Sequence, residues 1–314
     1  MHESRHVEFG IKVPTLSEDG SSGPNFTGNV IRFIQEVGDT YGTLWISDHL
    51  MPWVEGLGDD ADTLESWTTI CYLAGVFKNL KLGSAVLCNT FRNPMLLAKM
   101  AATLNVLTGN RFILGLGAGW NEREHVFYGY EFTGASARIS RLEEAVQIIR
   151  MMWTEDEVNF EGSYYNVKGA RCYPRPTAPP IIMIGGGGEK KTLRVVAGLA
   201  DWWNVPAMPI KALQHKIDVL RGHCSSMGRD FNEIRKTLEG FVAIAETKVE
   251  ADKIASRGRK AHFSGTPEMV VEQLNKYIDL GFNYYLVRFL DQPCTSGAKL
   301  FAERVVPFLD CRTR

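Results

Sequence analysis

The segment PIIMIGGGG at residues 180–188 joins a short apolar run to four consecutive glycines, Gly185, Gly186, Gly187 and Gly188. The density of Ile and Met predicts a strand that is buried on both faces. Four glycines in a row are entropically costly, but they allow successive backbone N–H groups to turn toward one ligand. Residues 190–200 follow with helical spacing. The glycines and the N-terminus of this helix predict a site for an anion, usually phosphate, with a ligand-free tight turn as the alternative.

The same order, a short apolar run and then a longer helical pattern, recurs along the chain. Strands are expected at residues 7–13, 43–47, 80–88, 111–116, 180–184, 201–205, 238–245 and 284–290. Helices are expected at residues 26–41, 64–77, 94–107, 136–153, 190–200, 210–227, 267–280 and 296–309. Buried parallel strands that are each followed by a helix favour a closed (β/α)₈ TIM barrel, with an open doubly wound sheet as the alternative. We therefore expect one α/β domain over residues 1–314.

One region does not fit the repeating pattern. Residues 154–180 are rich in Tyr, Gly and Pro and have no long helical period. We interpret them as an insertion in the barrel that forms a small hairpin lid.

The bulk composition excludes several classes of protein. The 314 residues carry a net charge of −1 and no basic stripe, so no nucleic-acid partner is expected. The short basic cluster Arg257, Arg259 and Lys260 is typical of a solvated loop. No apolar run approaches the roughly 20 residues that a membrane span needs. Residues 1–6 are polar and contain no apolar signal region, so we expect a cytoplasmic protein with no membrane partner.

Functional side chains of such barrels follow the C-terminal ends of the strands. His49 comes after the second expected strand and is preceded by Asp48. A histidine at this place can exchange a proton near neutral pH, although a structural histidine is the alternative. Strand one has no H-x-H motif and the chain has no H-E-x-x-H motif, so no metal site is expected. Trp53 and Trp120 lie in loops at the same end and are expected to wall the substrate pocket.

A second group of glycines, Gly115, Gly117 and Gly119, follows the fourth expected strand. Their spacing differs from the dinucleotide fingerprint G-x-G-x-x-G. We interpret them as making room for a flat ring, with close packing at the barrel rim as the alternative. Residues 120–125, which follow, show no clear helical pattern.

Several segments together resemble the bacterial-luciferase-like superfamily. These are LWISDH (44–49), GSAVL (83–87), LGLGAGWN (114–121), RLEEA (141–145) and IGGGG (184–188). The resemblance runs from about residue 9 to residue 290 and is closest to the branch that uses the deazaflavin coenzyme F420. It implies a (β/α)₈ barrel with a deazaflavin or flavin ring in its mouth and the cofactor phosphate on the loop after strand five. It also implies a non-prolyl cis peptide at Ala85-Val86 that supports the ring.

The resemblance implies a role for individual residues as well. Gly185 to Gly188 would bind the phosphate, while Asn89, Ala118 and Gly119 would line the ring. His49 would handle the proton that accompanies hydride transfer, and Asp48 would orient His49. In the similar glucose-6-phosphate dehydrogenases a glutamate directly follows the G-x-G, where this chain has Trp120. This departure puts sugar-phosphate oxidation in doubt.

Three functions remain open on these grounds. The first is an oxidoreductase that exchanges a hydride between coenzyme F420 and a small organic substrate. The second is an FMN-dependent monooxygenase, and the third is a flavin-binding barrel without catalytic activity. A homodimer is the family expectation, and the sequence does not indicate the substrate.

Overall fold

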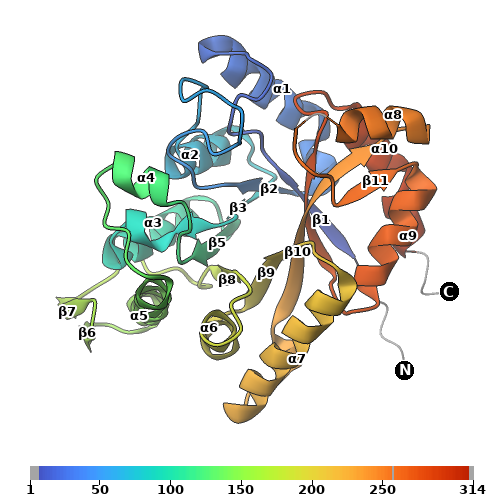
Figure 1. Cartoon of the computed structure of the whole chain (residues 1–314). Helices are drawn as coiled ribbons and strands as arrows, with labels where there is room; N and C mark the ends of the chain where they lie inside the picture. Colours follow the sequence, from blue (N-terminus) through green and yellow to red (C-terminus); the bar gives the residue numbers. More distant parts are fainter. Residues whose placement is uncertain (1–6, 257, 311–314) are drawn as a thin grey trace.

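The computed structural model, which describes residues 7–256 and 258–310, is a closed parallel barrel (Figure 1). Residues 1–6 and Arg257, which entered the predictions above, lie outside the described residues. Pairing of β9 with β10 closes the ring, so the prediction of a barrel is confirmed over an open sheet. The barrel strands are β1 (Glu8–Lys12), β2 (Thr43–Ile46), β3 (Lys81–Ser84), β5 (Phe112–Gly117), β8 (Ile181–Gly185), β9 (Trp202–Pro206), β10 (Arg235–Ile244) and β12 (Tyr284–Phe289).

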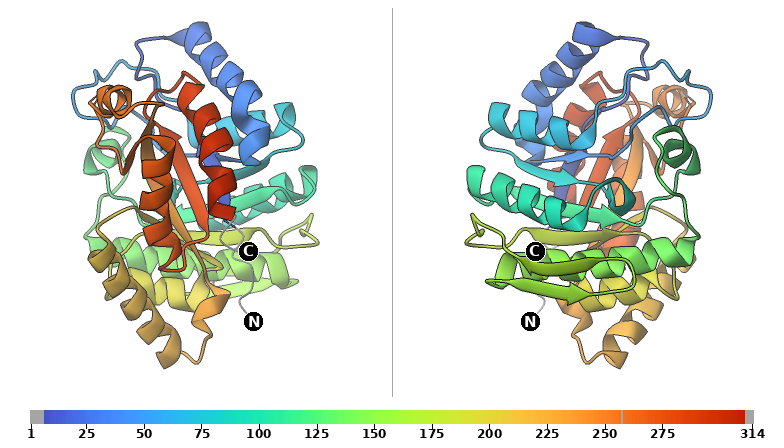
Figure 2. Two further views of the ribbon diagram at one scale, coloured as in Figure 1. Left: turned by 90° about the vertical axis from the view of Figure 1, so that its right-hand side faces the viewer. Right: turned by 90° about the vertical axis from the view of Figure 1, so that its left-hand side faces the viewer.

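Helices cover the outside of the barrel (Figure 2). The helices pack apolar faces against the strands, as in α1, where one face carries the buried residues Phe26, Val30, Phe33 and Val37. Helix α3 begins where expected, since Asn93 caps it and Pro94 fits its first turn. The covering helices are α1 (Gly23–Tyr41), α2 (Ser66–Val76), α3 (Pro94–Leu107), α5 (Ala135–Thr154), α6 (Thr192–Leu199), α7 (Ile210–Ser226), α9 (Pro267–Ile278), α10 (Ser296–Arg304) and α11 (Val306–Asp310).

Some short elements were not predicted. Residues 120–125 were expected to be irregular, but a helix, α4 (Glu122–Phe127), begins there. Its buried residues, Glu124 and His125, are polar, so no apolar period marks it. Helix α8 (Lys248–Ala255) buries little besides Ala251, and β11 (Phe263–Gly265) is a short strand that adds to β10. The remaining short elements are the 3₁₀ turns Asn89–Phe91 and Phe231–Glu233.

The third expected strand is interrupted. It divides into β3 and β4 (Leu87–Cys88), and the peptide bond between Ala85 and Val86 is cis, as the resemblance implied. The neighbouring β5 approaches this bulge closely. A Cβ atom added to Gly117 would lie 2.7 Å from a methyl group of Val86, and one added to Gly115 would lie 1.9 Å from the carbonyl oxygen of Ser84. Close packing therefore accounts for Gly115 and Gly117.

The insertion contains an antiparallel hairpin of β6 (Val158–Glu161) and β7 (Asn166–Ala170). The hairpin packs against α5, where the carboxylate of Glu144 accepts hydrogen bonds from the backbone N–H groups of residues 163–165. Figure 2 shows it on the outside of the barrel. None of residues 154–180 lines the cavity described below.

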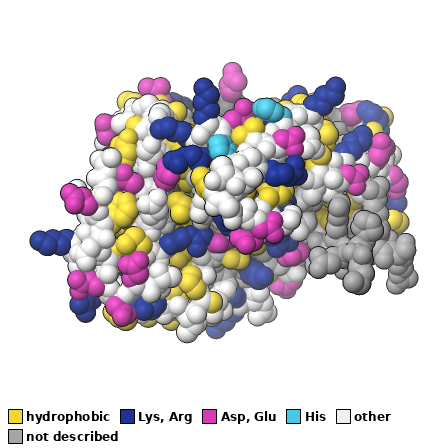
Figure 3. Space-filling model, turned by 90° about the horizontal axis from the view of Figure 1, so that it is seen from below, with side chains coloured by type: hydrophobic (Ala, Val, Ile, Leu, Met, Phe, Trp, Pro, Cys, Tyr) yellow, Lys and Arg dark blue, Asp and Glu magenta, His cyan; other side chains and the backbone are white. Residues whose placement is uncertain are grey.

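Acidic and basic side chains are interspersed on the face shown in Figure 3. Within residues 7–256 and 258–310, no helix is long and apolar enough to cross a membrane.

The contact between β3 and β5 predicts a steep cost for added volume. Gly115→Ala should lower the free energy of unfolding by about 1–3 kcal/mol, because the new methyl group would meet backbone that cannot move aside. Gly28→Ala is the matched control, because Gly28 lies on the exposed side of α1 with open space around it. This change should raise the free energy of unfolding by about 0.5–1 kcal/mol. Urea denaturation measures both values, and equal effects would contradict the packing argument.

Candidate active site

A cavity of about 540 Å³ opens at the C-terminal ends of the barrel strands. This is the position at which (β/α)₈ barrels carry their active sites. Most of the residues that the sequence singled out line it, namely Asp48, His49, Trp53, Ala85, Val86, Ala118, Gly119, Trp120, Gly185 and Gly186. Three others, Asn89, Gly187 and Gly188, do not line it.

Asn89 is buried with its side chain turned toward the insertion. Its Nδ2 atom lies 3.4 Å from the hydroxyl oxygen of Tyr165, to which it donates a hydrogen bond. Asn89 therefore joins the rim of the barrel to the β6–β7 hairpin.

The glycine loop presents unused donors beside the cavity. Gly186 has a φ of +127°, which favours glycine, and its N–H donates to the carbonyl of Asn204. Within the described part of the chain, the N–H groups of Gly187 and Gly188 have no acceptor. The ammonium group of Lys216 reaches the carbonyl oxygen of Gly187 at 2.7 Å. Lys216 also pairs with the carboxylate of Glu189 at 3.4 Å, so the two free N–H groups are the donors that suit an anion here.

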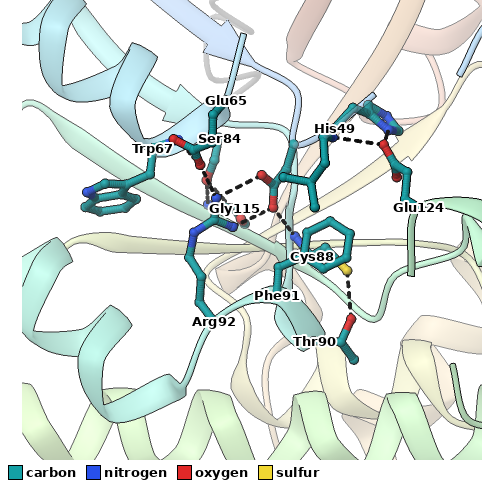
Figure 4. A network of polar contacts seen from close by, with 12 residues as sticks. His49, Glu65, Trp67, Ser84, Cys88, Thr90, Phe91, Arg92, Gly115 and Glu124 are labelled. Carbon is teal, nitrogen blue, oxygen red and sulfur yellow. Dashed lines mark hydrogen bonds and ion pairs between the residues drawn. The ribbon is translucent and has the colours of Figure 1, made fainter. Parts of the chain in front are cut away.

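His49 lies in the cavity wall and contacts two tryptophans. Its ring stacks on Trp53 with centroids 3.7 Å apart and meets the edge of Trp120 at 6.0 Å. The Nδ1 atom lies 2.9 Å from Oε1 of Glu124 (Figure 4). An ionised carboxylate only accepts hydrogen bonds, so a contact of this kind favours a proton on Nδ1. The Nε2 atom has no partner among the described residues.

Asp48 does not orient His49, which corrects the role expected for it. Its carboxylate accepts hydrogen bonds from the guanidinium of Arg92 at 2.7 and 3.0 Å and from the N–H of Cys88 at 2.8 Å. Arg92 also pairs with Glu65 (Figure 4). Burial alone would lower the pKa of Arg92, but the attraction of Asp48 and Glu65 outweighs it and raises that pKa above its usual value. Asp48 therefore links the segments at the rim of the barrel, and the carboxylate that contacts His49 is that of Glu124.

The other histidine at this end, His125, is fully buried. Its Nδ1 donates to the carbonyl of Asn121 and its Nε2 accepts from the hydroxyl of Thr90, each at 2.7 Å. Both ring nitrogens are thus occupied, and His125 supports the loop that leads into α4.

A second part of the cavity wall is charged. Lys12 pairs with Glu239, and Glu18 receives Arg288 at 2.7 Å and Arg259 at 2.8 Å. Burial lowers the pKa of both Lys12 and Arg288, although their acidic partners oppose the shift. Three cations face two carboxylates, so this wall carries one excess positive charge.

The structure corrects the interpretation of Arg259 as part of a solvated loop. Its guanidinium lies over the rings of Trp53 and Phe241, at 5.4 and 5.2 Å from their centroids, and lines the cavity. Lys12 and Arg288 could have been found from the sequence, because each is a basic residue inside an otherwise apolar strand. Arg259 and Glu124 carry no such signal.

No three His, Cys, Asp or Glu side chains lie close enough to bind a metal ion within the part of the chain that the structure describes.

Comparison with known proteins agrees with this architecture. The sequence model of a family described as luciferase-like monooxygenase matches residues 7–264. A relative named F420-dependent glucose-6-phosphate dehydrogenase from Amycolatopsis mediterranei is 37% identical over 155 residues, which is 49% of this chain and 45% of that protein. A relative of the same name from Microbacterium testaceum is 27% identical over 338 residues, covering 96% of this chain and 97% of that protein.

A solved structure shows the same fold. It is an F420-dependent secondary alcohol dehydrogenase in complex with an F420-acetone adduct, with a TM-score of 0.82 at 16% identity, covering 97% of this chain and 99% of that chain. Because the family model spans β1 to β11, which includes most of the cavity wall, the match concerns the barrel and its site alike. The chain belongs to the luciferase-like monooxygenase family.

Proposed function

We propose that this protein is an oxidoreductase that exchanges a hydride between coenzyme F420 and a small organic substrate. The observation that carries the proposal is the placement of His49: its ring lines the cavity, its Nδ1 atom contacts the carboxylate of Glu124, and its Nε2 atom has no partner among the described residues. The relatives named F420-dependent dehydrogenases support the choice of cofactor.

The residues present fit this cofactor in two respects. The N–H groups of Gly187 and Gly188 lack acceptors in the described chain and would hold its phosphate. The cis-peptide bulge at Ala85 and Val86 lines the cavity and would support a flat ring. When bound, coenzyme F420 supplies a ring carbon that accepts or donates a hydride, and the protein provides placement and electrostatics.

His49 would handle the proton. In the direction of oxidation, its Nε2 atom accepts the proton of the substrate hydroxyl, and in reduction it returns a proton to the carbonyl oxygen. Glu124 keeps the other ring nitrogen protonated throughout. The rings of Trp53 and Trp120 both contact His49 and would restrict the position of the substrate.

The charged wall supports a substrate that carries an acidic group. Lys12, Arg259 and Arg288 outnumber their carboxylate partners, and Arg259 and Arg288 converge on one oxygen atom of Glu18. A carboxylate or phosphate of the substrate would be a suitable partner for the same two guanidinium groups. We therefore propose an anionic hydroxy or carbonyl compound as the substrate.

An FMN-dependent monooxygenase is the second candidate. The description of the matching family favours it, and the glycine loop would suit the phosphate of FMN equally well.

His49→Ala tests the proton-transfer role. We expect turnover of coenzyme F420 with a responsive substrate to fall by about 10²- to 10⁴-fold, because the variant loses its general acid–base group. Affinity for the coenzyme, measured separately by fluorescence titration, should change little. A variant that turns over as fast as the parent protein would remove this role from His49.

Arg259→Gln tests the substrate class. The KM of an anionic substrate should rise by about 10- to 100-fold, since a charged hydrogen bond is lost, whereas the KM of a neutral analogue should not. Arg194→Gln is the control, because Arg194 pairs with Glu143 on the outside of the barrel. If both arginine variants behave alike, the charged wall does not recognise the substrate.

A further inference from the structure

Glu124 is a buried carboxylate in the wall of the cavity. Its side chain is 2% exposed, and its Oε1 atom accepts hydrogen bonds from Nδ1 of His49 at 2.9 Å and from the N–H of Leu50 at 3.0 Å. No lysine or arginine of residues 7–256 and 258–310 forms an ion pair with it. A buried carboxylate needs a compensating partner, and within residues 7–256 and 258–310 the ion pair that Glu124 forms is with His49.

Glu124 is held in place by contacts on both sides of it along α4. The neighbouring His125 is fixed between Asn121 and Thr90. Just after the end of α4, the hydroxyl of Tyr128 donates to the carbonyl of Leu50 at 2.6 Å, and on the other side of Glu124, Arg123 pairs with Asp59 in the loop after His49. These contacts dock α4 on the segment that carries His49, so the carboxylate cannot easily move away from the ring.

This arrangement has a chemical consequence for His49. An imidazole that donates from Nδ1 to a fixed carboxylate is locked in one tautomer, with the lone pair of Nε2 available to another molecule. When Nε2 accepts a proton, the adjacent carboxylate stabilises the resulting imidazolium, as a buried carboxylate does in a hydrolase triad. The stacking of Trp53 leaves the ring little freedom to turn.

We infer that Glu124, rather than the adjacent Asp48, is the positioning residue for His49. Glu124 sets the tautomer and the orientation of the ring, so that Nε2 meets the substrate as a proton acceptor. The catalytic consequence rests on the function proposed above, whereas the tautomer is a property of the protein without any cofactor or substrate.

Imidazole ¹⁵N chemical shifts test the tautomer directly. In cofactor-free protein labelled with ¹⁵N-histidine, at a pH where the ring is neutral, the His49 signal should show a protonated Nδ1 and an unprotonated Nε2. His49→Asn identifies the signal. Glu124→Gln keeps the size of the side chain and an acceptor for Leu50, but its amide can also donate to Nδ1, so it should give a mixture of tautomers. Glu122→Gln, an exposed change in the same helix, should leave the spectrum as it is.

The same variants carry a kinetic test. Glu124→Gln should lower kcat by about 10- to 100-fold while the KM of the substrate stays close to the parent value, and Glu122→Gln should match the parent. An unaltered tautomer or an unaltered kcat in Glu124→Gln would overturn the inference. If the parent protein shows the expected tautomer but no turnover of coenzyme F420, the proposed function fails while the tautomer assignment stands.

Discussion

The ion pair between Asp48 and Arg92 is the interaction on which the arrangement of the site depends. Asp48 follows β2 and Arg92 follows β4, so their pairing ties two strand ends together at the rim of the barrel. The carboxylate is fully buried and also accepts the N–H of Cys88. Removing one partner from a buried pair typically costs about 3–5 kcal/mol, because a charge is left without compensation. The backbone at Asp48 is thereby fixed, and His49 is placed in the cavity wall.

Asp48 and His49 are adjacent in sequence but take part in separate ion pairs. Asp48 uses its own charge to bind Arg92, whereas His49 obtains a carboxylate from Glu124, which lies 75 residues farther along the chain. Because the two ion pairs are separate, Asp48 and Arg92 can make the rim rigid while Nε2 of His49 stays available. The bulge at Val86, which packs against Gly117, completes the same wall.

The barrel could be predicted from the sequence because its strands and covering helices bury apolar side chains at regular spacing. Helix α3 was predicted to the residue, since Pro94 and the apolar spacing mark its limits. Helix α4 was missed because its buried residues are polar, and α8 because it buries so little. A helix is recognised in a sequence by apolar residues at helical spacing, and these two helices do not have that spacing.

The location of the site could also be predicted, but its internal pairing could not. His49, Trp53, Trp120 and the glycines follow strand ends, and the fold brings most of them to one cavity. The partner predicted for His49, Asp48, was wrong, because a tertiary contact with Glu124 of α4 takes that place. The role of Arg259 was missed for the same reason, since its partners Glu18 and Trp53 lie in distant loops.

On the function proposed above, this cavity binds a deazaflavin for hydride transfer. Equilibrium titration of the purified protein with coenzyme F420 and, separately, with FMN tests it most directly. We expect saturable, one-to-one binding of coenzyme F420 that is much tighter than binding of FMN. This binding should be lost in Gly188→Asp, which places a carboxylate beside the free N–H groups. Tight binding of FMN with no binding of coenzyme F420 would contradict it.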